Sequence, residues 1–398
     1  MELSATETER RHPADSIRFS APVLSDDTIT FKVQRGPVID DVSFSIPPGF
    51  RVHPDCMAAS LATFCGTSFH QIEFAFPVSE KLRTAIASWS GATVIAEGST
   101  EPRQRGTRTA LNFSGGFDSL AAYYLAPAEQ LRCAIDFGGW FKRERQFFET
   151  QKPDIICSTD FRSKGYDRQS WMFMAAPSIL LADYLDLEAI GFGTNFESSR
   201  WHYHSKLDAS PRGAGNALFA GVGLHDATLT RGLTGFGITK VLCHFAPDLI
   251  PLSLKSLAPE GSIKRMRKTM VYESTRHVLG GAPPALEAAP HPAKRYKLGE
   301  NYTEDVLALI LAKLHGSRPV SRWMEGLETV DEDELAGVDV SWAFKFNPIF
   351  EQYIPSPLRT TVMQRLAEAQ VETFCEGDWD HYRAFRQILE RFHKFPVQ

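Results

Sequence analysis

Strand-like and helix-like segments alternate regularly between Thr109 and Gly193. Short apolar runs that are typical of buried strands occupy residues 110–113, 131–137, 154–158 and 188–193. Helix-like segments between them reach Leu125 and Gln151 and cover residues 167–185. Such alternation predicts an α/β domain with a parallel, doubly wound sheet and helices on both of its faces. Because ligands of these sheets bind at the carboxyl ends of the strands, the turns after each run are the candidate binding loops.

Regions of different character flank this segment. Residues 1–27 are polar and predict a loose N-terminal arm, and residues 28–105 mix short strand-like and helix-like stretches, which predicts an α+β accessory lobe. The α/β domain itself is expected over residues 106–275, with an irregular glycine-rich loop at 211–237. Apolar residues at helical spacing then predict a mainly helical C-terminal lobe over residues 276–398.

Composition narrows the class of protein. The 43 lysines and arginines oppose 48 acidic residues, for a net charge of -5, which argues against bulk nucleic-acid binding. The 6 cysteines are scattered, which favours free thiols. No apolar segment follows the polar first residues, so we expect a cytoplasmic protein without a membrane anchor. A homodimer or a partner protein is left open.

The segment from Leu111 to Leu125 carries the main candidate site. An apolar run leads into Ser-Gly-Gly-Phe-Asp-Ser, residues 114–119, and then into an amphipathic helix. Adjacent glycines let the backbone approach a ligand, and the helix start offers N–H groups to an anion such as phosphate. A carboxylate at Asp118 would repel phosphate unless a cation lies between them, which implies magnesium. A glycine turn with Asp118 as the helix cap explains the same residues without a ligand.

The order of these residues, between a strand and a helix, resembles the signature of the PP-loop ATP pyrophosphatases, which have a HUP-like fold. No Gly-Lys-Ser or Gly-Lys-Thr follows it, unlike the Walker-type loop. The resemblance implies ATP and magnesium as ligands, and an AMP- and pyrophosphate-forming ligase or synthetase that adenylates an acidic or amide substrate. It also implies a set of residues that holds the departing pyrophosphate: Ser114, Gly115, Gly116, Phe117, Asp118 and Ser119.

Within that family, residues 109–270 are most similar to the 7-cyano-7-deazaguanine synthase branch. Residues 166–170, with Arg168, resemble its Gly-Arg-Asn element, and residues 189–197, with Asn195 and Glu197, resemble its strand and Gly-Val-Asn turn. Those three side chains and Asp160 are candidate substrate or magnesium ligands. That branch carries a four-cysteine zinc site, whereas residues 262–270 contain no cysteine, so we expect no zinc. Some relatives of the 7-cyano-7-deazaguanine synthases accompany bacterial antiviral systems, so the resemblance leaves a role in antiviral defence open.

Four cationic side chains replace the zinc ligands of that branch: Lys264, Arg265, Arg267 and Lys268. They fit either a cluster that neutralises phosphate or an acidic substrate, or the solvated face of a helix. Near the end of the second strand, Asp136, Phe137 and Gly138 are expected to bind adenine as in PP-loop enzymes, and a tight turn that needs glycine is the alternative explanation.

Two further functions are compatible with the sequence. A non-catalytic ATP-binding sensor or scaffold would use the same loop without turnover. A tRNA-modifying PP-loop enzyme would need a basic RNA-binding face and usually a reactive cysteine pair, and the net charge of -5 and the scattered cysteines speak against it. Cys157, at a strand end, is a candidate nucleophile as in tRNA-thiolating enzymes; a buried structural cysteine is the alternative, because no partner cysteine is spaced to resolve it. The acceptor, whether a nucleobase-like small molecule, tRNA or protein, is not specified by the motif.

Overall fold

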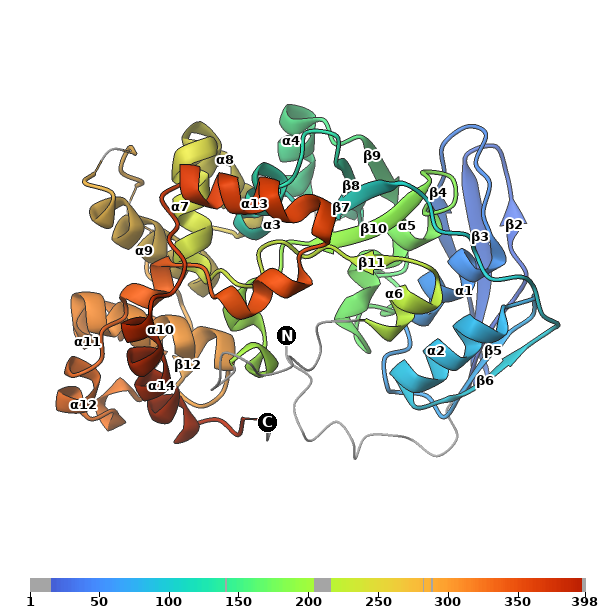
Figure 1. The fold of residues 1–398 in the computed structure, drawn as a ribbon. Coiled ribbons are helices and arrows are strands. Elements are labelled where there is room, and N and C mark those ends of the chain that lie inside the picture. Colours follow the sequence, from blue (N-terminus) through green and yellow to red (C-terminus); the bar gives the residue numbers. More distant parts are fainter. Residues whose placement is uncertain (1–15, 140–141, 204–215, 282, 288, 396–398) are drawn as a thin grey trace. The chain divides into compact units, whose positions relative to one another are not determined.

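A computed structural model of the chain describes residues 16–139, 142–203, 216–281, 283–287 and 289–395 (Figure 1). These residues form two compact units that are interleaved in sequence. The first unit comprises the described parts of residues 1–114, 129–191 and 214–227, and the second those of residues 115–128, 192–213 and 228–398. The predicted divisions at residues 105 and 275 do not coincide with the boundaries of these units.

A mixed sheet in the first unit has the strand order β2-β3-β1-β5-β6, with β4 paired to β3. Its strands are β1 (Ser16–Phe19), β2 (Val23–Leu24), β3 (Thr28–Arg35), β4 (Val38–Ser45), β5 (Gln71–Phe74) and β6 (Thr93–Ala96). The alternating side chains Ile29, Phe31 and Val33 are fully buried, as expected for a strand with one face on a core. Helices α1 (Pro54–Ala62) and α2 (Glu80–Ser90) belong to the same unit, and α2 is capped by Ser79.

The prediction of a loose arm over residues 1–27 is corrected for its described part. Strand β1 lies between β3 and β5, antiparallel to the first and parallel to the second. Ile17 and Phe19 are fully buried while Arg18 is exposed, so β1 has the alternation of a half-buried strand. Two apolar residues are too few for this pattern to be recognised in a polar segment. Residues 1–15 of the predicted arm lie outside the described residues.

The second sheet of this unit is parallel and has five strands in the order β11-β10-β7-β8-β9. They are β7 (Arg108–Asn112), β8 (Leu131–Asp136), β9 (Ile155–Ser158), β10 (Leu187–Phe192) and β11 (His225–Asp226). The prediction of an α/β protein with a parallel sheet is therefore confirmed. Helices α4 (Lys142–Gln151), α5 (Ala176–Leu180) and α6 (Ala217–Gly221) belong to the same unit.

Two predicted elements around this sheet differ from the structure. In place of a long helix over residues 167–185 there is a 3-10 helix, η3 (Trp171–Ala175), followed by the short α5, because Pro177 can only occupy the first turn of a helix. The glycine-rich stretch 211–237 contains α6, β11 and the start of α7 (Gly235–Phe245), and its residues 211–215 lie outside the described residues. A Cβ on Gly235 would lie 3.1 Å from Glu197 Oε1, so that glycine serves close packing and not a turn.

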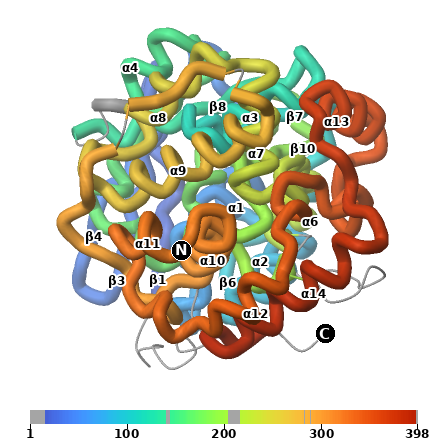
Figure 2. The backbone as a smooth tube through the Cα atoms, turned by 90° about the vertical axis from the view of Figure 1, so that its left-hand side faces the viewer, coloured from blue at the N-terminus to red at the C-terminus, as the bar shows by residue number. Residues whose placement is uncertain are grey.

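The second unit is mainly helical. Besides α7 it contains α3 (Phe117–Leu125), α8 (Ile250–Leu257), α9 (Ile263–Val278), α10 (Tyr302–His315), α11 (Ser317–Val320), α12 (Glu332–Ala336), α13 (Ser356–Glu368) and α14 (Glu376–Glu390). Helices α10, α13 and α14 lie where helical spacing predicts them. Helix α9 contacts both α7 and α10, as the view in Figure 2 illustrates. Strands β12 (Tyr296–Lys297) and β13 (Met324–Glu325) form a two-stranded sheet.

Short 3-10 helices connect these elements of the second unit: η4 (Phe196–Ser198), η5 (Arg200–His202), η6 (Pro247–Leu249), η7 (Leu327–Thr329), η8 (Ser341–Phe344) and η9 (Pro348–Tyr353). Aromatic side chains form much of the core, and the ring of Trp342 lies 5.3 Å from that of Tyr382. Phe196, next to the candidate site, joins this cluster at 5.9 Å from Tyr382. No helix in the described part of the chain is long and apolar enough to cross a membrane.

Candidate functional site

The Ser-Gly-Gly-Phe-Asp-Ser segment lies between β7 and α3. Gly115 has a φ of 73°, a conformation that favours glycine, and its carbonyl accepts a hydrogen bond of 2.7 Å from the Ser253 hydroxyl. Gly116 is the N-cap of α3 and provides no side-chain cap. The alternative interpretation of Asp118 as the helix cap is therefore wrong: Asp118 lies within the first turn, where a carboxylate interacts favourably with the helix dipole.

Asp118 forms an ion pair with one of the four predicted cations. The Nζ atom of Lys268, on α9, lies 3.0 Å from Asp118 Oδ1, and it also lies 5.4 Å from the centre of the Phe117 ring. The Lys268 side chain is only 4% exposed, whereas that of Asp118 is 25% exposed. The pair thus has a buried cation and a carboxylate that solvent or a ligand can reach.

The loop after β10 approaches the same turn of α3. A Cβ added to Gly193 would lie 2.1 Å from the backbone nitrogen of Ser119, so this backbone contact requires glycine. Asn195 Nδ2, two residues further on, lies 3.5 Å from Asp118 Oδ1. Three separate segments therefore converge on Asp118: the start of α3, the Gly193 to Asn195 loop and the face of α9 that carries Lys268.

Glu197 lies beneath this group and is fully buried. Its Oε1 atom accepts hydrogen bonds of 3.0 Å from Asn195 Nδ2 and 3.0 Å from the backbone N–H of Gly235, and its Oε2 atom is buried without a hydrogen-bond partner. Burial raises the pKa of the Glu197 carboxyl to about 7, an effect that the nearby Lys268 ammonium partly offsets. Burial thus favours the protonated form of this carboxyl.

The other three predicted cations do not share the position of Lys268. Arg267 is buried and pairs with Glu304 of α10. The Arg265 guanidinium lies 3.9 Å from Glu260 and donates to the carbonyl of Leu254, and Lys264 is exposed. Successive helix positions point about 100° apart, so the predicted cluster is divided among several faces of α9. Of the four, it is Lys268 that pairs with Asp118 in the Ser114 to Ser119 segment.

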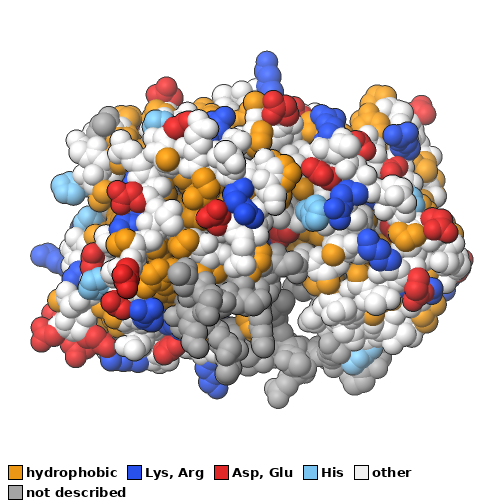
Figure 3. Space-filling view, viewed as in Figure 1, with side chains coloured by type: hydrophobic (Ala, Val, Ile, Leu, Met, Phe, Trp, Pro, Cys, Tyr) orange, Lys and Arg blue, Asp and Glu red, His pale blue; other side chains and the backbone are white. Residues whose placement is uncertain are grey.

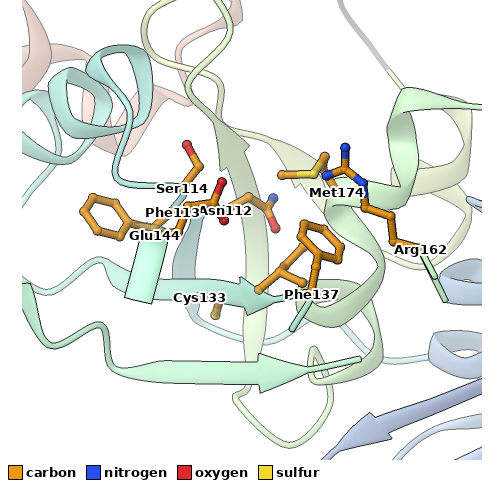
Figure 4. A pocket seen from close by; sticks show the side chains of 9 residues that line it. Asn112, Phe113, Ser114, Cys133, Phe137, Glu144, Arg162 and Met174 are labelled. Atoms are coloured by element: carbon orange, nitrogen blue, oxygen red, sulfur yellow. The ribbon is translucent and has the colours of Figure 1, made fainter. Parts of the chain in front are cut away.

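A pocket in the first unit lies where β7 and β8 end (Figure 4). It is lined by Asn112, Phe113, Ser114, Cys133, Ile135, Phe137, Glu144, Arg162 and Met174. Figure 4 shows Phe137 and Arg162 on one side and Ser114 on the other, and the Arg162 guanidinium lies 5.2 Å from the centre of the Phe137 ring. Sequence reasoning identified Ser114 and Phe137 but missed Arg162 and Met174, which lie outside any motif.

Two further candidates, Asp136 and Asp160, have structural partners in the first unit. Asp136 accepts hydrogen bonds from the Gly138 N–H at 2.8 Å and from Arg145, as in a tight turn, so adenine binding here stays a prediction. Asp160 accepts from the Ser43 N–H at 2.9 Å and from Lys164 at 2.6 Å. Arg168 is exposed, and the structure gives it no ligand role.

Cys157 has the features of a structural cysteine. It is buried, its thiol contacts the carbonyl of Ser45 at 3.3 Å, and burial raises its pKa to about 12. A thiol with that pKa is almost entirely protonated at neutral pH and is a poor nucleophile. Among the described residues no three histidine, cysteine, aspartate or glutamate side chains group as metal ligands, and the expectation that zinc is absent stays a prediction.

Comparison of the chain with protein-family models, with curated proteins and with solved structures finds no match. The chemistry of the site is therefore inferred from the positions of the chain's own residues.

Proposed function

We propose that this chain is an ATP-dependent synthetase or ligase of the PP-loop type, with a HUP-like doubly wound sheet, that adenylates an acidic or amide substrate. Pyrophosphate would leave first and AMP second. The Lys268–Asp118 pair at the start of α3 carries this proposal, because it joins a buried cation and a reachable carboxylate to a glycine-rich helix start. The acceptor is a small molecule or a macromolecule with a carboxylate or amide oxygen.

The residues around Asp118 fit the polyphosphate of ATP. The backbone of Gly115 and Gly116 leaves room for a close approach to the start of α3, where N–H groups and the helix dipole favour an anion. Ser114 and Ser119 carry hydroxyl groups at the two ends of the segment. Lys268 is positioned to exchange its contact with Asp118 for one with a phosphate oxygen, which would leave the carboxylate available as a ligand.

Magnesium fits the site as well, because the carboxylate of Asp118 is a hard oxygen ligand of the kind that this ion prefers, together with phosphate oxygens. Bound there, magnesium would neutralise charge on the departing pyrophosphate. Lys268 would stabilise the same developing charge from its buried position.

A non-catalytic sensor or scaffold is the second candidate, because the same Lys268–Asp118 pair and glycine-rich helix start could bind ATP without turning it over. The two candidates differ in turnover. A synthetase releases pyrophosphate when a competent acceptor is present, whereas a sensor binds ATP and releases none. The tRNA-thiolating alternative is not supported by Cys157, since its thiol is buried and its pKa is raised.

Calorimetric titration of the full-length chain with α,β-methylene-ATP, with and without magnesium, tests the first requirement. We expect magnesium-dependent binding, and its loss in Asp118→Asn. A coupled pyrophosphate assay with panels of carboxylic acids, nucleobase-like acids, tRNA and peptides then separates the two candidates. Absence of nucleotide binding would exclude both.

A further inference from the structure

We propose that Glu197 is a positioning residue for Asp118, and that it acts through the side-chain amide of Asn195. The inference rests on the proposed function, because Asp118 is its end point. It assigns Glu197 a role other than that of a substrate or magnesium ligand, which the motif resemblance suggested.

The first step is the fixed placement of Glu197 itself. Its side chain is fully buried, its Oε1 atom accepts the N–H of Gly235 at the start of α7, and its own backbone carbonyl accepts a 2.9 Å hydrogen bond from the Thr303 hydroxyl of α10. A carboxylate at a helix start is favoured by the dipole of α7. Glu197 is thus held by two helices and has no exposed surface with which to contact a substrate.

Glu197 in turn orients the side-chain amide of Asn195. The Nδ2 atom of Asn195 has two hydrogens, and its two acceptors are Glu197 Oε1 at 3.0 Å and Asp118 Oδ1 at 3.5 Å. The Asn195 backbone is also held, since its carbonyl lies 3.2 Å from Nδ1 of the buried His202. Because Asn195 Nδ2 donates one of its hydrogens to Glu197 Oε1, its other hydrogen is directed towards Asp118.

The charged and polar groups that face Glu197 agree with this role. They are Asp118 on α3, Lys268 and Arg267 on α9, Asn195 on its own loop and the Gly235 N–H on α7, while Glu304 on α10 is engaged by Arg267. Glu197 therefore lies behind the Lys268–Asp118 pair, where it can fix the geometry of the pair without touching the ligand. The 3.5 Å contact is the longest in the series, so its loss should have a moderate effect.

A double-mutant cycle on α,β-methylene-ATP binding in the presence of magnesium tests the inference, because only coupled positions give a non-additive result. Asn195→Ala and Glu197→Met, which removes the acceptor at similar volume, should each weaken binding about five- to tenfold. The double variant should be no weaker than either single one. Glu197→Gln keeps an oxygen acceptor for both donors and should bind within about twofold of the unaltered chain.

Thr230→Val is the matched control. The Thr230 hydroxyl is fully buried and donates a 2.8 Å hydrogen bond to the Thr194 carbonyl in the same loop, but it does not lead to Asp118. It should leave the nucleotide affinity within about twofold, even if it lowers the melting temperature.

The outcomes separate the inference from the proposed function. Additive losses in the cycle, or an unchanged affinity in Asn195→Ala, would overturn the role of Glu197 while leaving ATP binding intact. If Glu197→Met does not fold, the Asn195→Ala result decides in the same way. If the unaltered chain does not bind the nucleotide, the proposed function and this inference both fall.

Discussion

Asp118 and Lys268 form one ion pair, yet replacing each should have different consequences. Asp118→Asn keeps an oxygen that can accept from Lys268, so the buried ammonium is not left without a partner. The variant should remain folded, with a melting temperature within a few degrees of the unaltered chain. Because the amide cannot replace the carboxylate as a magnesium ligand, pyrophosphate release should fall by about 100-fold or more. Full turnover in this variant would show that Asp118 has no role in the reaction.

For Lys268 the expected loss is in nucleotide affinity. Lys268→Met retains much of the apolar stem but removes the cation next to Asp118. Loss of one hydrogen bond to a charged phosphate oxygen costs about 1.5 to 3 kcal/mol, so the dissociation constant for magnesium-ATP should rise about ten- to a hundredfold. Lys255→Met, at an exposed position of α8, is the control and should bind normally. Equal effects in both variants would contradict a specific role for Lys268.

Glu197 should make the stability of the protein depend on pH in a definite direction. Its pKa is about 7 in the folded chain and 4.5 is the ordinary value, so the folded state binds the proton more tightly. The stabilisation from this proton is complete below about pH 4.5 and is lost as the pH rises through about 7. Between about pH 5 and 8 the unaltered chain should lose roughly 2 to 3 kcal/mol relative to Glu197→Gln, measured by urea unfolding. Parallel pH profiles would mean that Glu197 titrates normally.

At the level of elements, the contact between α3 and the loop after β10 depends on glycine at position 193, which has no side chain. A Cβ at position 193 would meet the Ser119 nitrogen at 2.1 Å, and backbone cannot move aside as a flexible side chain can. Gly193→Ala should therefore destabilise the fold by about 1 to 3 kcal/mol and should also weaken nucleotide binding. In Gly377→Ala, on α14, the new Cβ meets nothing within 4 Å, and stability should be unchanged or slightly higher. Thermal unfolding of the two variants compares these positions directly.

The elements that sequence patterns predict well are those with long, regular periodicity. Strands β7 to β10 and helices α10, α13 and α14 appear where the patterns place them, because burial on one face imposes the period. The sequence pattern does not predict strand β1, because the strand has only two buried apolar residues. The predicted helix over 167–185 fails at Pro177, and Gly235 appears within α7 because tertiary packing, and not local turn geometry, requires it there.

Some residues of the candidate site can be predicted from the local sequence, whereas the pairing of others depends on tertiary packing. The segment 114–119 is readable from local order, and so are Asn195 and Glu197 as residues at a strand end. The pairing of Lys268 with Asp118, and of Arg267 with Glu304, depends on which faces of α9 meet α3 and α10. No local pattern distinguishes these two adjacent cations, so the sequence predicted one cluster where the structure has separate pairs.

For the whole molecule, the sign and distribution of charge bear on the class of ligand. The face in Figure 3 intersperses acidic and basic side chains, and the net charge of the chain is -5. A net charge of this sign favours a localised anion site over bulk binding of nucleic acid.

Product analysis with labelled ATP is the most decisive test of the proposed adenylation. Full-length chain is incubated with α-labelled ATP, magnesium and the acceptor panel, and the labelled products are separated by thin-layer chromatography or mass spectrometry. A loop that holds the β and γ phosphates as one leaving group favours cleavage between the α and β phosphorus atoms. We expect labelled AMP or an adenylated acceptor, in amounts equal to the pyrophosphate released and absent in Asp118→Asn. Labelled ADP with free phosphate would contradict adenylation by this protein.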